Sequence, residues 1–422
     1  MPRTSHRRLC AAALLVASVL APLTAPPATA VPAVPSPSDG RYGGTPGPDE
    51  AQGHRPGHGH GHGDDCPRGG FGPALTAKLD RTIENARKKA GIPGLVVGLW
   101  MPGKGCYVRA TGVADKRTGA PMPVDTFVRI GSETKTFTVT ALLELVDEGK
   151  VGLDDPIDDY IRGVPNGDKI TLRHLAEMRS GLFPYTSDPD FIHDLLSAPN
   201  RPYNPWEVLS YGYRHANTFA PGTKFEYCNS NLVLLGLVVE KVTGQPLARV
   251  IHERVVRPAG LERTFLPKGA EFPEPHAHGY TDQTLSGAEA DATDWNPSWA
   301  WAAGGMISNL QDLRRWAPVL ATGTLLSPET QKQRLKTLPT GFPGTSYGLG
   351  IFDANGWLGH NGSLPGYETV TVYLPEEKAT LVLILNTDST TAQGQEPSSP
   401  VARDITALMT PKHVYDGKVP PR

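Results

Sequence analysis

The sequence predicts an α+β fold: an antiparallel β-sheet flanked by helices, made from both ends of the chain, with an all-helical lobe inserted between them. Three observations support it. Strand patterns occur near residues 95–113 and return at 348–386, whereas the region from 151 to 263 alternates helical patterns with loops. In addition, 39% of the 422 residues are apolar, which is enough for a full core and excludes a wholly disordered chain.

Residues 1–30 have the pattern of a secretory signal peptide. Three arginines in the first eight residues precede a nearly continuous apolar stretch from Leu9 to Leu20, and Ala28-Thr29-Ala30 offers a small-x-small cleavage site. No cysteine stands directly after that site, where a lipoprotein anchor would need one, and no later apolar run reaches the roughly 18 residues that a spanning helix needs. We therefore expect a secreted, cell-wall-associated protein without a membrane anchor.

Residues 31–70 form a Pro-, Gly- and His-rich linker that we expect to be disordered, because it has almost no branched apolar residues to bury. The tract from His54 to Cys66 has two interpretations. Imidazoles, carboxylates and a thiol suit Zn²⁺ or Cu²⁺, but alternating glycines do not fix a coordination geometry, so we expect a low-complexity spacer. The folded domain is predicted over 71–412, with a tail at 413–422.

The first elements follow from periodicity. Leu75, Leu79, Ile83 and Ala86 recur at helical spacing before the Gly91-Ile92-Pro93-Gly94 stop. Residues 95–100 then predict a buried strand, which a Pro-Gly turn joins to a second strand at 106–113.

Helices are predicted at 133–148, 232–242 and 247–255, and a last one at 401–409. The strands near the C-terminus are predicted at 348–352, 357–360, 367–374 and 380–386.

Charge and cysteine content narrow the function classes. The net charge of −2 argues against a general polyanion binder, so we expect no nucleic-acid partner. Cleavage of the signal leaves Cys66, Cys106 and Cys228, an odd number that allows one bridge and a free thiol or three free thiols. We favour a Cys66–Cys106 bridge, which would pin the tail onto the first hairpin.

Ser132 and Lys135 lie three residues apart at the start of a predicted helix, which puts both on one face. A desolvated lysine can take the serine proton, and the helix N-terminus favours a developing oxyanion. By itself this pattern is also consistent with a simple helix-capping serine.

Two further groups carry chemistry. Tyr227 and Asn229 stand before a helix, where a phenol can carry a proton and an amide can hold a substrate carbonyl, or where they only pack and cap. His360 precedes Gly362 and Ser363 at a strand end. There the imidazole would hydrogen-bond the tyrosine and the Ser363 N–H would complete an oxyanion hole, unless the segment is only a tight turn.

In this order, Ser-x-x-Lys, Tyr-x-Asn and His-x-Gly resemble the serine penicillin-recognising family, which includes class C β-lactamases, D-alanyl-D-alanine carboxypeptidases and related esterases. Flanking stretches agree over about 71–409, namely 127–132, 170–175, 180–182, 227–236, 303–308 and 347–350. The resemblance implies the fold predicted above, with the site in the cleft between sheet and helical lobe, and a mechanism that needs no cofactor. The sequence contains no GxSxG elbow, so an α/β-hydrolase is not indicated, and no HExxH motif of a metal site.

The resemblance also implies roles. Ser132 would be the acylated nucleophile, Lys135 its base and Tyr227 the proton relay, while Asn229 would hold the substrate amide. His360 replaces a lysine that is more common there. Gly362 would leave room for substrate, the amides of Ser132 and Ser363 would form the oxyanion hole, and the Ser363 hydroxyl would bind a carboxylate. Trp299 and Trp301 would either wall the cleft or only pack the following helix.

We therefore expect a monomeric serine hydrolase that acts on peptidoglycan stem peptides as a D-alanyl-D-alanine carboxypeptidase. Its alternatives are an esterase, a β-lactamase-type hydrolase of β-lactam-like molecules, or a non-catalytic cell-wall binder. Two departures bear on this choice. Cys228 replaces the usual Ser or Ala, and residues 351–353 stand where some carboxypeptidases carry an arginine that clamps the free carboxylate.

Overall fold

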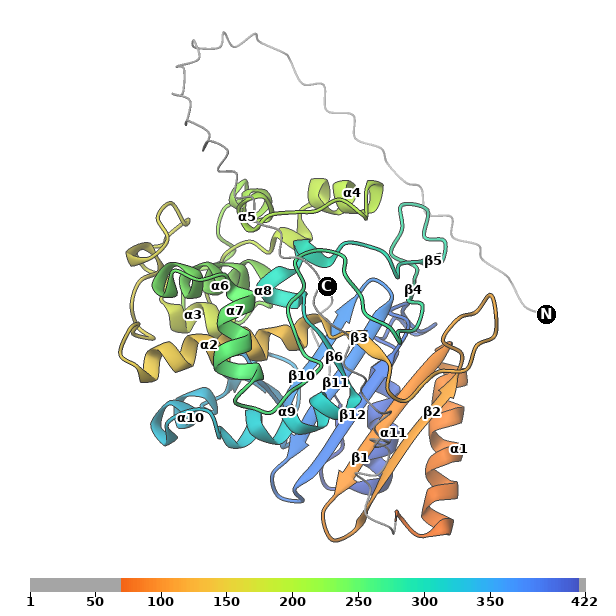
Figure 1. The fold of residues 1–422 in the computed structure, drawn as a ribbon. Helices are drawn as coiled ribbons and strands as arrows, with labels where there is room; N and C mark the ends of the chain where they lie inside the picture. The colour runs from red at the N-terminus through yellow and green to blue at the C-terminus, as the bar shows by residue number, and fades with distance from the viewer. Residues whose placement is uncertain (1–69, 417–422) are drawn as a thin grey trace, which may run out of the picture. The chain divides into compact units, whose positions relative to one another are not determined.

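The computed structural model describes residues 70–416, and its centre is an eight-stranded sheet in the order β2-β1-β12-β11-β10-β9-β8-β7 (Figure 1). Neighbouring strands pair antiparallel throughout. The strands of this sheet are β1 (Gly94–Met101), β2 (Gly105–Gly112), β7 (Leu338–Pro339), β8 (Thr345–Tyr347), β9 (Phe352–Ala354), β10 (Trp357–Leu364), β11 (Tyr367–Leu374) and β12 (Ala379–Leu385). Two small pairs lie outside it, β3 (Phe127–Arg129) with β6 (Ile307–Asn309) and β4 (Tyr280–Thr281) with β5 (Ala290–Asp291).

The two ends of the described chain pair within one sheet, as predicted. β1 pairs with β12, with Leu95 opposite Leu385, and every residue of both strands is buried. Strands buried on both faces are continuously apolar, which explains why their patterns were legible in the sequence. The predicted fold class is thus confirmed.

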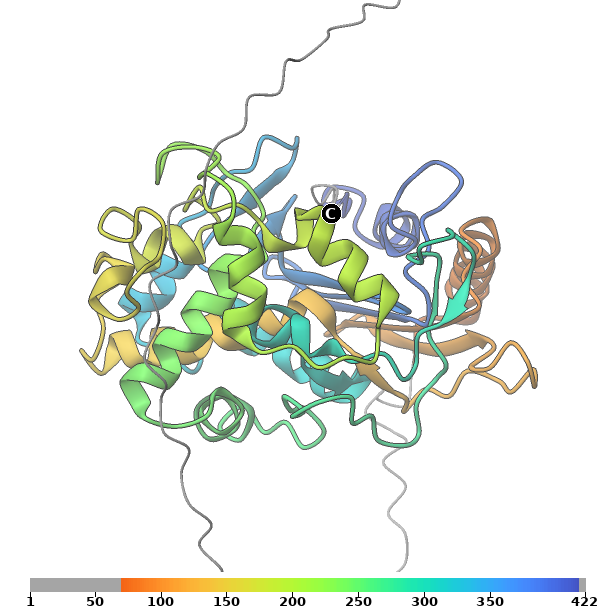
Figure 2. The ribbon, with the colours of Figure 1, turned by 90° about the horizontal axis from the view of Figure 1, so that it is seen from above.

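Helices cover both faces of the sheet. α1 (Pro73–Lys89) and α11 (Ser398–Met409) pack on one face, and Figure 2 shows them on the opposite side of the strands from the inserted helices. The helices on that other side are α2 (Thr134–Asp147), α3 (Leu172–Ala176), α4 (Pro189–Ser197), α5 (Pro205–Tyr213), α6 (Asn229–Thr243), α7 (Leu247–Ile251), α8 (Trp301–Gly304), α9 (Leu310–Thr322) and α10 (Pro328–Arg334). Single helical turns lie at Gly131–Glu133 (η1), Ile157–Asp159 (η2), Tyr185–Ser187 (η3), His252–Val256 (η4) and Pro297–Trp299 (η5).

One predicted strand, 348–352, is wrong. β8 ends at Tyr347 and β9 begins at Phe352, and the residues between them form a turn. A Cβ on Gly348 would lie 2.1 Å from the Arg334 carbonyl oxygen, and Gly350 has φ +65°, which favours glycine. β10, in contrast, runs four residues beyond the predicted His360, to Leu364.

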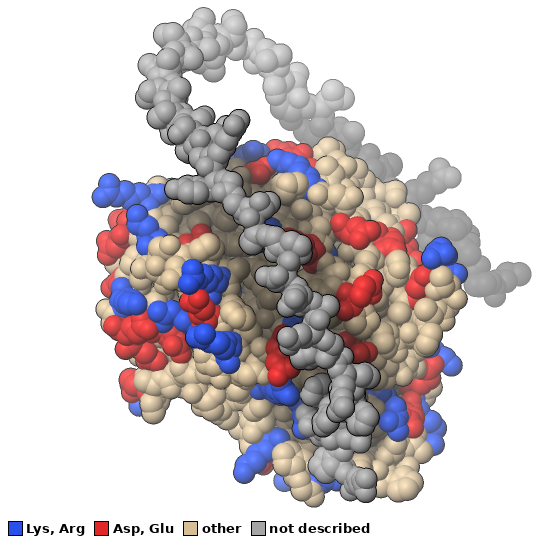
Figure 3. All heavy atoms as spheres, viewed as in Figure 1, with Lys and Arg blue, Asp and Glu red and all other residues tan. Residues whose placement is uncertain are grey.

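The signal segment, the His-rich tract and the end of the tail lie outside the described residues. Cys106 is disulfide-bonded, and its partner lies outside them too, so the pairing with Cys66 stays a prediction. Cys228 is a buried free thiol. Within residues 70–416, no helix is long and apolar enough to cross a membrane, and no cluster of three or more His, Cys, Asp or Glu is placed to hold a metal ion. On the face drawn in Figure 3, the acidic and basic side chains outside the grey trace are interspersed.

Candidate active site

Ser132 lies in the single turn η1, directly before α2. The preceding Gly131 has φ +51°, and a Cβ there would lie 2.4 Å from the backbone nitrogen of Ser363 on β10. Only glycine allows this approach. The turn is therefore pressed against β10, so the amides of Ser132 and Ser363 belong to adjoining backbone segments, as an oxyanion hole made from these two groups requires.

Lys135 lies one turn further on and is fully buried. Its Nζ donates to Ser132 Oγ at 2.8 Å and to the carbonyl oxygen of Ala303 at 2.7 Å. Burial lowers the pKa of Lys135 well below its ordinary value, because the desolvated ammonium loses its hydration. A neutral amine within hydrogen-bond reach of an alcohol can take its proton.

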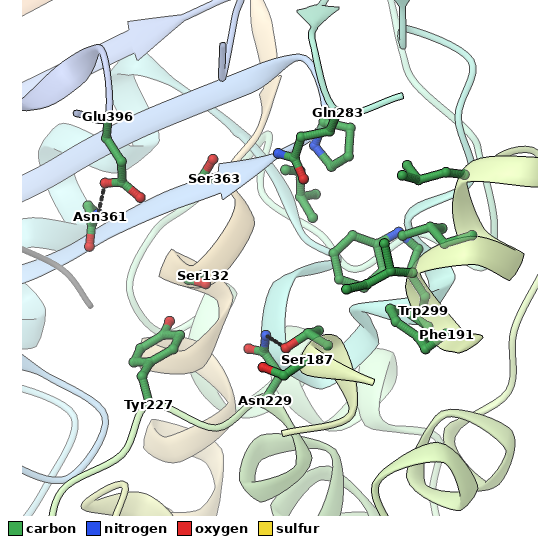
Figure 4. Close-up of a pocket in the computed structure, with 16 residues that line it drawn as sticks. Ser132, Ser187, Phe191, Tyr227, Asn229, Gln283, Trp299, Asn361, Ser363 and Glu396 are labelled. Atoms are coloured by element: carbon green, nitrogen blue, oxygen red, sulfur yellow. Dashed lines mark hydrogen bonds between the residues drawn. The ribbon is translucent and has the colours of Figure 1, made fainter. Parts of the chain in front are cut away.

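Tyr227 reaches the same place from the loop before α6. Lys135 Nζ lies 4.8 Å from the centroid of the Tyr227 ring, and Figure 4 shows the phenol hydroxyl directed toward Ser132. Asn229 is the first residue of α6, and its Nδ2 lies 3.5 Å from Thr186 Oγ1. The structure thus brings together Ser132, Lys135, Tyr227 and Asn229 from two separate stretches of chain.

His360 lies behind this group, buried among aromatic rings, and does not line the pocket. Its ring centroid is 6.2 Å from that of Tyr227, but its nitrogens have other partners: Nε2 lies 3.2 Å from the hydroxyl of Tyr347 and Nδ1 2.5 Å from the Asn361 carbonyl oxygen. Burial, aided by the Lys135 charge, lowers the pKa of His360 to about 3. The imidazole also packs near the Tyr227 ring, and the direct hydrogen bond between His360 and Tyr227 stays a prediction.

Gly362 has a structural reason besides the predicted room for substrate, which stays a prediction. A Cβ there would lie 1.8 Å from the carbonyl oxygen of Ile130, so the absent side chain makes room for the nucleophile turn. Ser363 does line the pocket, and its buried Oγ has no hydrogen-bond partner among the described residues. β9 pairs with β10 only from Trp357 to Gly359, so the following part of this β10 edge has no strand beside it in the described chain.

The pocket in front of Ser132 has a polar and an apolar end (Figure 4). At the polar end, Asn361 Nδ2 donates to Glu396 Oε2 at 3.1 Å. The apolar end is lined by Trp299 and by side chains of α4. The complete lining is Ser132, Thr186, Ser187, Phe191, Ile192, Leu195, Leu196, Tyr227, Asn229, Gln283, Trp299, Asn361, Ser363, Leu364, Pro365 and Glu396.

The two tryptophans have different surroundings. Trp299 lines the pocket, whereas Trp301 packs its ring against α6, where a Cβ on Gly236 would lie 2.9 Å from it. Trp301 therefore has a packing contact, but with the earlier helix α6, whereas the predicted packing alternative named the following helix. Sequence reasoning assigned no role to Asn361, although it lies inside the quoted His-x-Gly motif, and overlooked Glu396 and the α4 residues. The apolar spacing of α4 was the one available signal, and it is equally typical of core.

Glu133, directly after the nucleophile, is also buried. Its side chain is 1% exposed and faces the hydroxyls of Thr369 and Thr371 on β11. Neither carboxylate oxygen has a hydrogen bond of full geometry with a described residue. Desolvation raises the pKa of Glu133 to about 8, and the two threonine hydroxyls offset part of this rise. Desolvation therefore disfavours the charged form of two groups of opposite ordinary charge beside Ser132.

Known proteins resemble this chain over most of the described region. The family model named Beta-lactamase matches residues 79–399. A D-aminopeptidase of Brucella anthropi is 29% identical over 74% of this chain and 59% of its own length. A putative D-alanyl-D-alanine carboxypeptidase of Escherichia coli O157:H7 is 29% identical over 53% of this chain and 52% of its own length. The chain thus spans a little over half the length of these relatives.

A solved structure also resembles this chain. A D-stereospecific amidohydrolase from Streptomyces sp. superposes with a TM-score of 0.70 at 30% identity, covering 80% of this chain and 99% of that one.

Proposed function

The chain belongs to the β-lactamase family of serine hydrolases, and from this premise we propose that it cleaves amide bonds through an acyl-enzyme formed on Ser132. One observation carries the proposal. A fully buried Lys135, whose pKa is lowered by desolvation, has its Nζ 2.8 Å from Ser132 Oγ. That contact is what an alcohol needs to become a nucleophile at neutral pH.

The proposed reaction has two halves. Lys135 accepts the Ser132 proton as Oγ bonds to the substrate carbonyl carbon, and the amides of Ser132 and Ser363 bind the oxyanion. The C–N bond then breaks while Tyr227, beside Lys135, delivers a proton to the leaving nitrogen. In the second half, water attacks the acyl carbon with the same groups acting in reverse, which releases the acid and restores Ser132.

The specific substrate that the sequence predicted is the terminal D-Ala of peptidoglycan stem peptides. The relative named a putative D-alanyl-D-alanine carboxypeptidase supports this choice. In this form of the proposal the substrate lies along the open edge of β10, and its free carboxylate lies near the Ser363 hydroxyl, which needs a partner.

A second candidate is the hydrolysis of D-amino acid amides and of peptides with an N-terminal D-residue. Phe352 favours it, because this side chain, 6% exposed and stacked on Tyr227, occupies the stretch where a clamping arginine would stand. Relatives named D-aminopeptidase and D-stereospecific amidohydrolase point the same way. The leaving group of a D-amino acid amide carries no carboxylate, so the site needs no arginine to bind it.

We further propose that the protein is exported after cleavage following Ala30 and works as a monomer at the cell wall. N-terminal sequencing of the protein recovered from culture medium tests the first claim, and light scattering tests the second.

The acyl-enzyme is tested by intact-mass spectrometry after incubation with a penicillin. We expect one covalent adduct on the wild type and on Ser286→Ala, an exposed serine outside the pocket, and none on Ser132→Ala. An adduct that persists in Ser132→Ala contradicts the proposal. Comparing turnover of a D-Ala-D-Ala peptide, a D-amino acid amide, an aryl ester and a cephalosporin then decides between the candidates.

A further inference from the structure

The end of the pocket beside Trp299 is lined by apolar side chains that the acyl-transfer chemistry does not use. Phe191, Ile192, Leu195 and Leu196 come from α4, and Trp299 comes from η5. Ile192 is 42% exposed although it lies on the pocket wall, so a large apolar side chain meets water there. A bound apolar group would remove that surface from water, which is favourable.

This wall is rigid. The Phe191 ring makes edge contacts with three surrounding aromatic rings and with Trp299, at a centroid distance of 6.0 Å for the tryptophan. The Tyr185 hydroxyl donates to the Trp299 carbonyl oxygen at 2.7 Å, which ties η5 to the helical lobe. A preformed wall binds a ligand without a large ordering cost.

The position of the wall decides which part of a substrate it meets. Figure 4 shows Tyr227 and the Asn361–Glu396 pair on one side of Ser132, with Phe191 and Trp299 on the other. A proton relay must face the leaving nitrogen, so the leaving group lies on the Tyr227 side. The acyl half of the substrate therefore extends toward Trp299.

We propose that the surface formed by Phe191, Ile192, Leu195, Leu196 and Trp299 is an acyl side-chain subsite that selects substrates with a bulky apolar residue at the attacked carbonyl. This inference rests on the proposed acyl-enzyme function and names its substrate class. The whole pocket, its polar end included, has a volume of about 170 Å³. The methyl group of an alanyl donor covers little of the apolar wall, whereas a leucyl or phenylalanyl side chain covers more of it and removes more apolar surface from water.

The test compares kcat/KM for the p-nitroanilides of D-Ala, D-Leu and D-Phe. We expect the D-Leu and D-Phe substrates to exceed D-Ala by about 10–200-fold, the range typical of added methylenes in an apolar pocket. Burst release from p-nitrophenyl acetate, which has no side chain, reports separately whether Ser132 is acylated at all.

Two variants locate the effect. Ile192→Ser should reduce the D-Leu to D-Ala ratio several-fold, and Leu196→Trp, which fills the subsite, should reduce the D-Phe to D-Ala ratio by more. Trp206→Ser is the matched control, since Trp206 is an equally apolar, 52% exposed side chain outside the pocket, and should keep the wild-type ratios.

The outcomes separate the two proposals. If p-nitrophenyl acetate gives a burst but the three anilides react equally, or the ratios stay unchanged in both α4 variants, the subsite is refuted while the acyl-enzyme stands. If neither p-nitrophenyl acetate nor a penicillin acylates the wild type, the proposed function itself fails.

Discussion

The nucleophile turn has two sides that differ in how they treat a buried ionisable group. On the side facing α8, Lys135 donates two hydrogen bonds, to Ser132 and to Ala303. On the side facing the sheet, Glu133 is equally buried but has no hydrogen-bond partner of full geometry in the described chain. Desolvation disfavours the charged form of both groups, lowering the pKa of the amine and raising that of the carboxyl.

The difference teaches that burial alone does not make a catalytic group. In the proposed mechanism Lys135 acts as the base because its neutral form has a proton donor, Ser132 Oγ, at 2.8 Å. Glu133 faces the hydroxyls of Thr369 and Thr371, which take no part in the proposed reaction, so its protonation bears on stability and on the electrostatics beneath the proposed oxyanion amides. The predictions below probe each side in turn.

The largest effect is expected from Lys135→Arg. A guanidinium stays protonated and cannot accept the Ser132 proton, so we expect the acylation rate to fall by about 10²–10⁴-fold. Stopped-flow measurement of the p-nitrophenyl acetate burst checks this. A burst rate near that of the wild type would show that Lys135, on the side facing α8, does not act as the base.

Glu133→Gln should change how stability depends on pH. The folded-state pKa of Glu133, about 8, lies above its ordinary 4.5, so the native state holds a proton that the unfolded chain releases over this window. Wild-type unfolding free energy therefore falls between pH 4.5 and 8 by up to about 1.4 kcal/mol per pH unit from this group. Relative to wild type, the glutamine variant should gain about 4 kcal/mol between pH 5 and 8.

Urea unfolding at a series of pH values measures that gain. The control is Glu329→Gln, an exposed carboxylate on α10, which should follow the wild-type curve. If the unfolding free energies of Glu133→Gln and of the wild type change with pH in the same way, the Glu133 carboxyl does not have a raised pKa in the folded protein.

Gly362→Ala probes the contact between β10 and the nucleophile turn. Its Cβ would lie 1.8 Å from the Ile130 carbonyl oxygen, so the turn must shift. We expect a loss of about 1–3 kcal/mol in stability, with slower acylation because the oxyanion amides move apart. Gly72→Ala, where nothing lies within 4 Å of the added Cβ, is the control.

The smallest effect is expected from Thr369→Val, on the sheet side. The hydroxyl of Thr369 donates to the Ile130 carbonyl oxygen at 3.2 Å, so its loss should cost about 0.5–1.5 kcal/mol. The Glu133 pKa should also rise further, because this hydroxyl now lowers it. Thr369→Ser keeps the hydroxyl and should restore both properties, whereas an equal loss in the serine variant would assign the effect to packing.

Much of the fold was predictable because its signals are local. The periodicity of Leu79, Ile83 and Ala86 marks α1, and the continuous apolar runs mark β1 and β12, which are buried on both faces. The strand expected at 348–352 failed for a non-local reason, since Arg334 presses its carbonyl against Gly348 and a turn results.

The candidate site likewise contains residues that the sequence revealed and residues that it did not. Tyr227 and Asn229 were recognisable as a motif, but the partner of His360 was not, because Tyr347 lies on β8, which β9 separates from the strand of His360. The α4 wall of the pocket was equally hidden. An apolar helix face has the same pattern whether it meets a core or a substrate.

The sequence by itself determined that Ser132 and Lys135 would meet, because helix geometry places residues three apart on one face whatever surrounds them. The tertiary structure alone decided that Lys135 and Glu133 are both desolvated, that His360 bonds Tyr347, and that Ile192 and Trp299 face the pocket. Spacing along a helix follows from covalent geometry, whereas burial and choice of partner depend on which distant segments pack together.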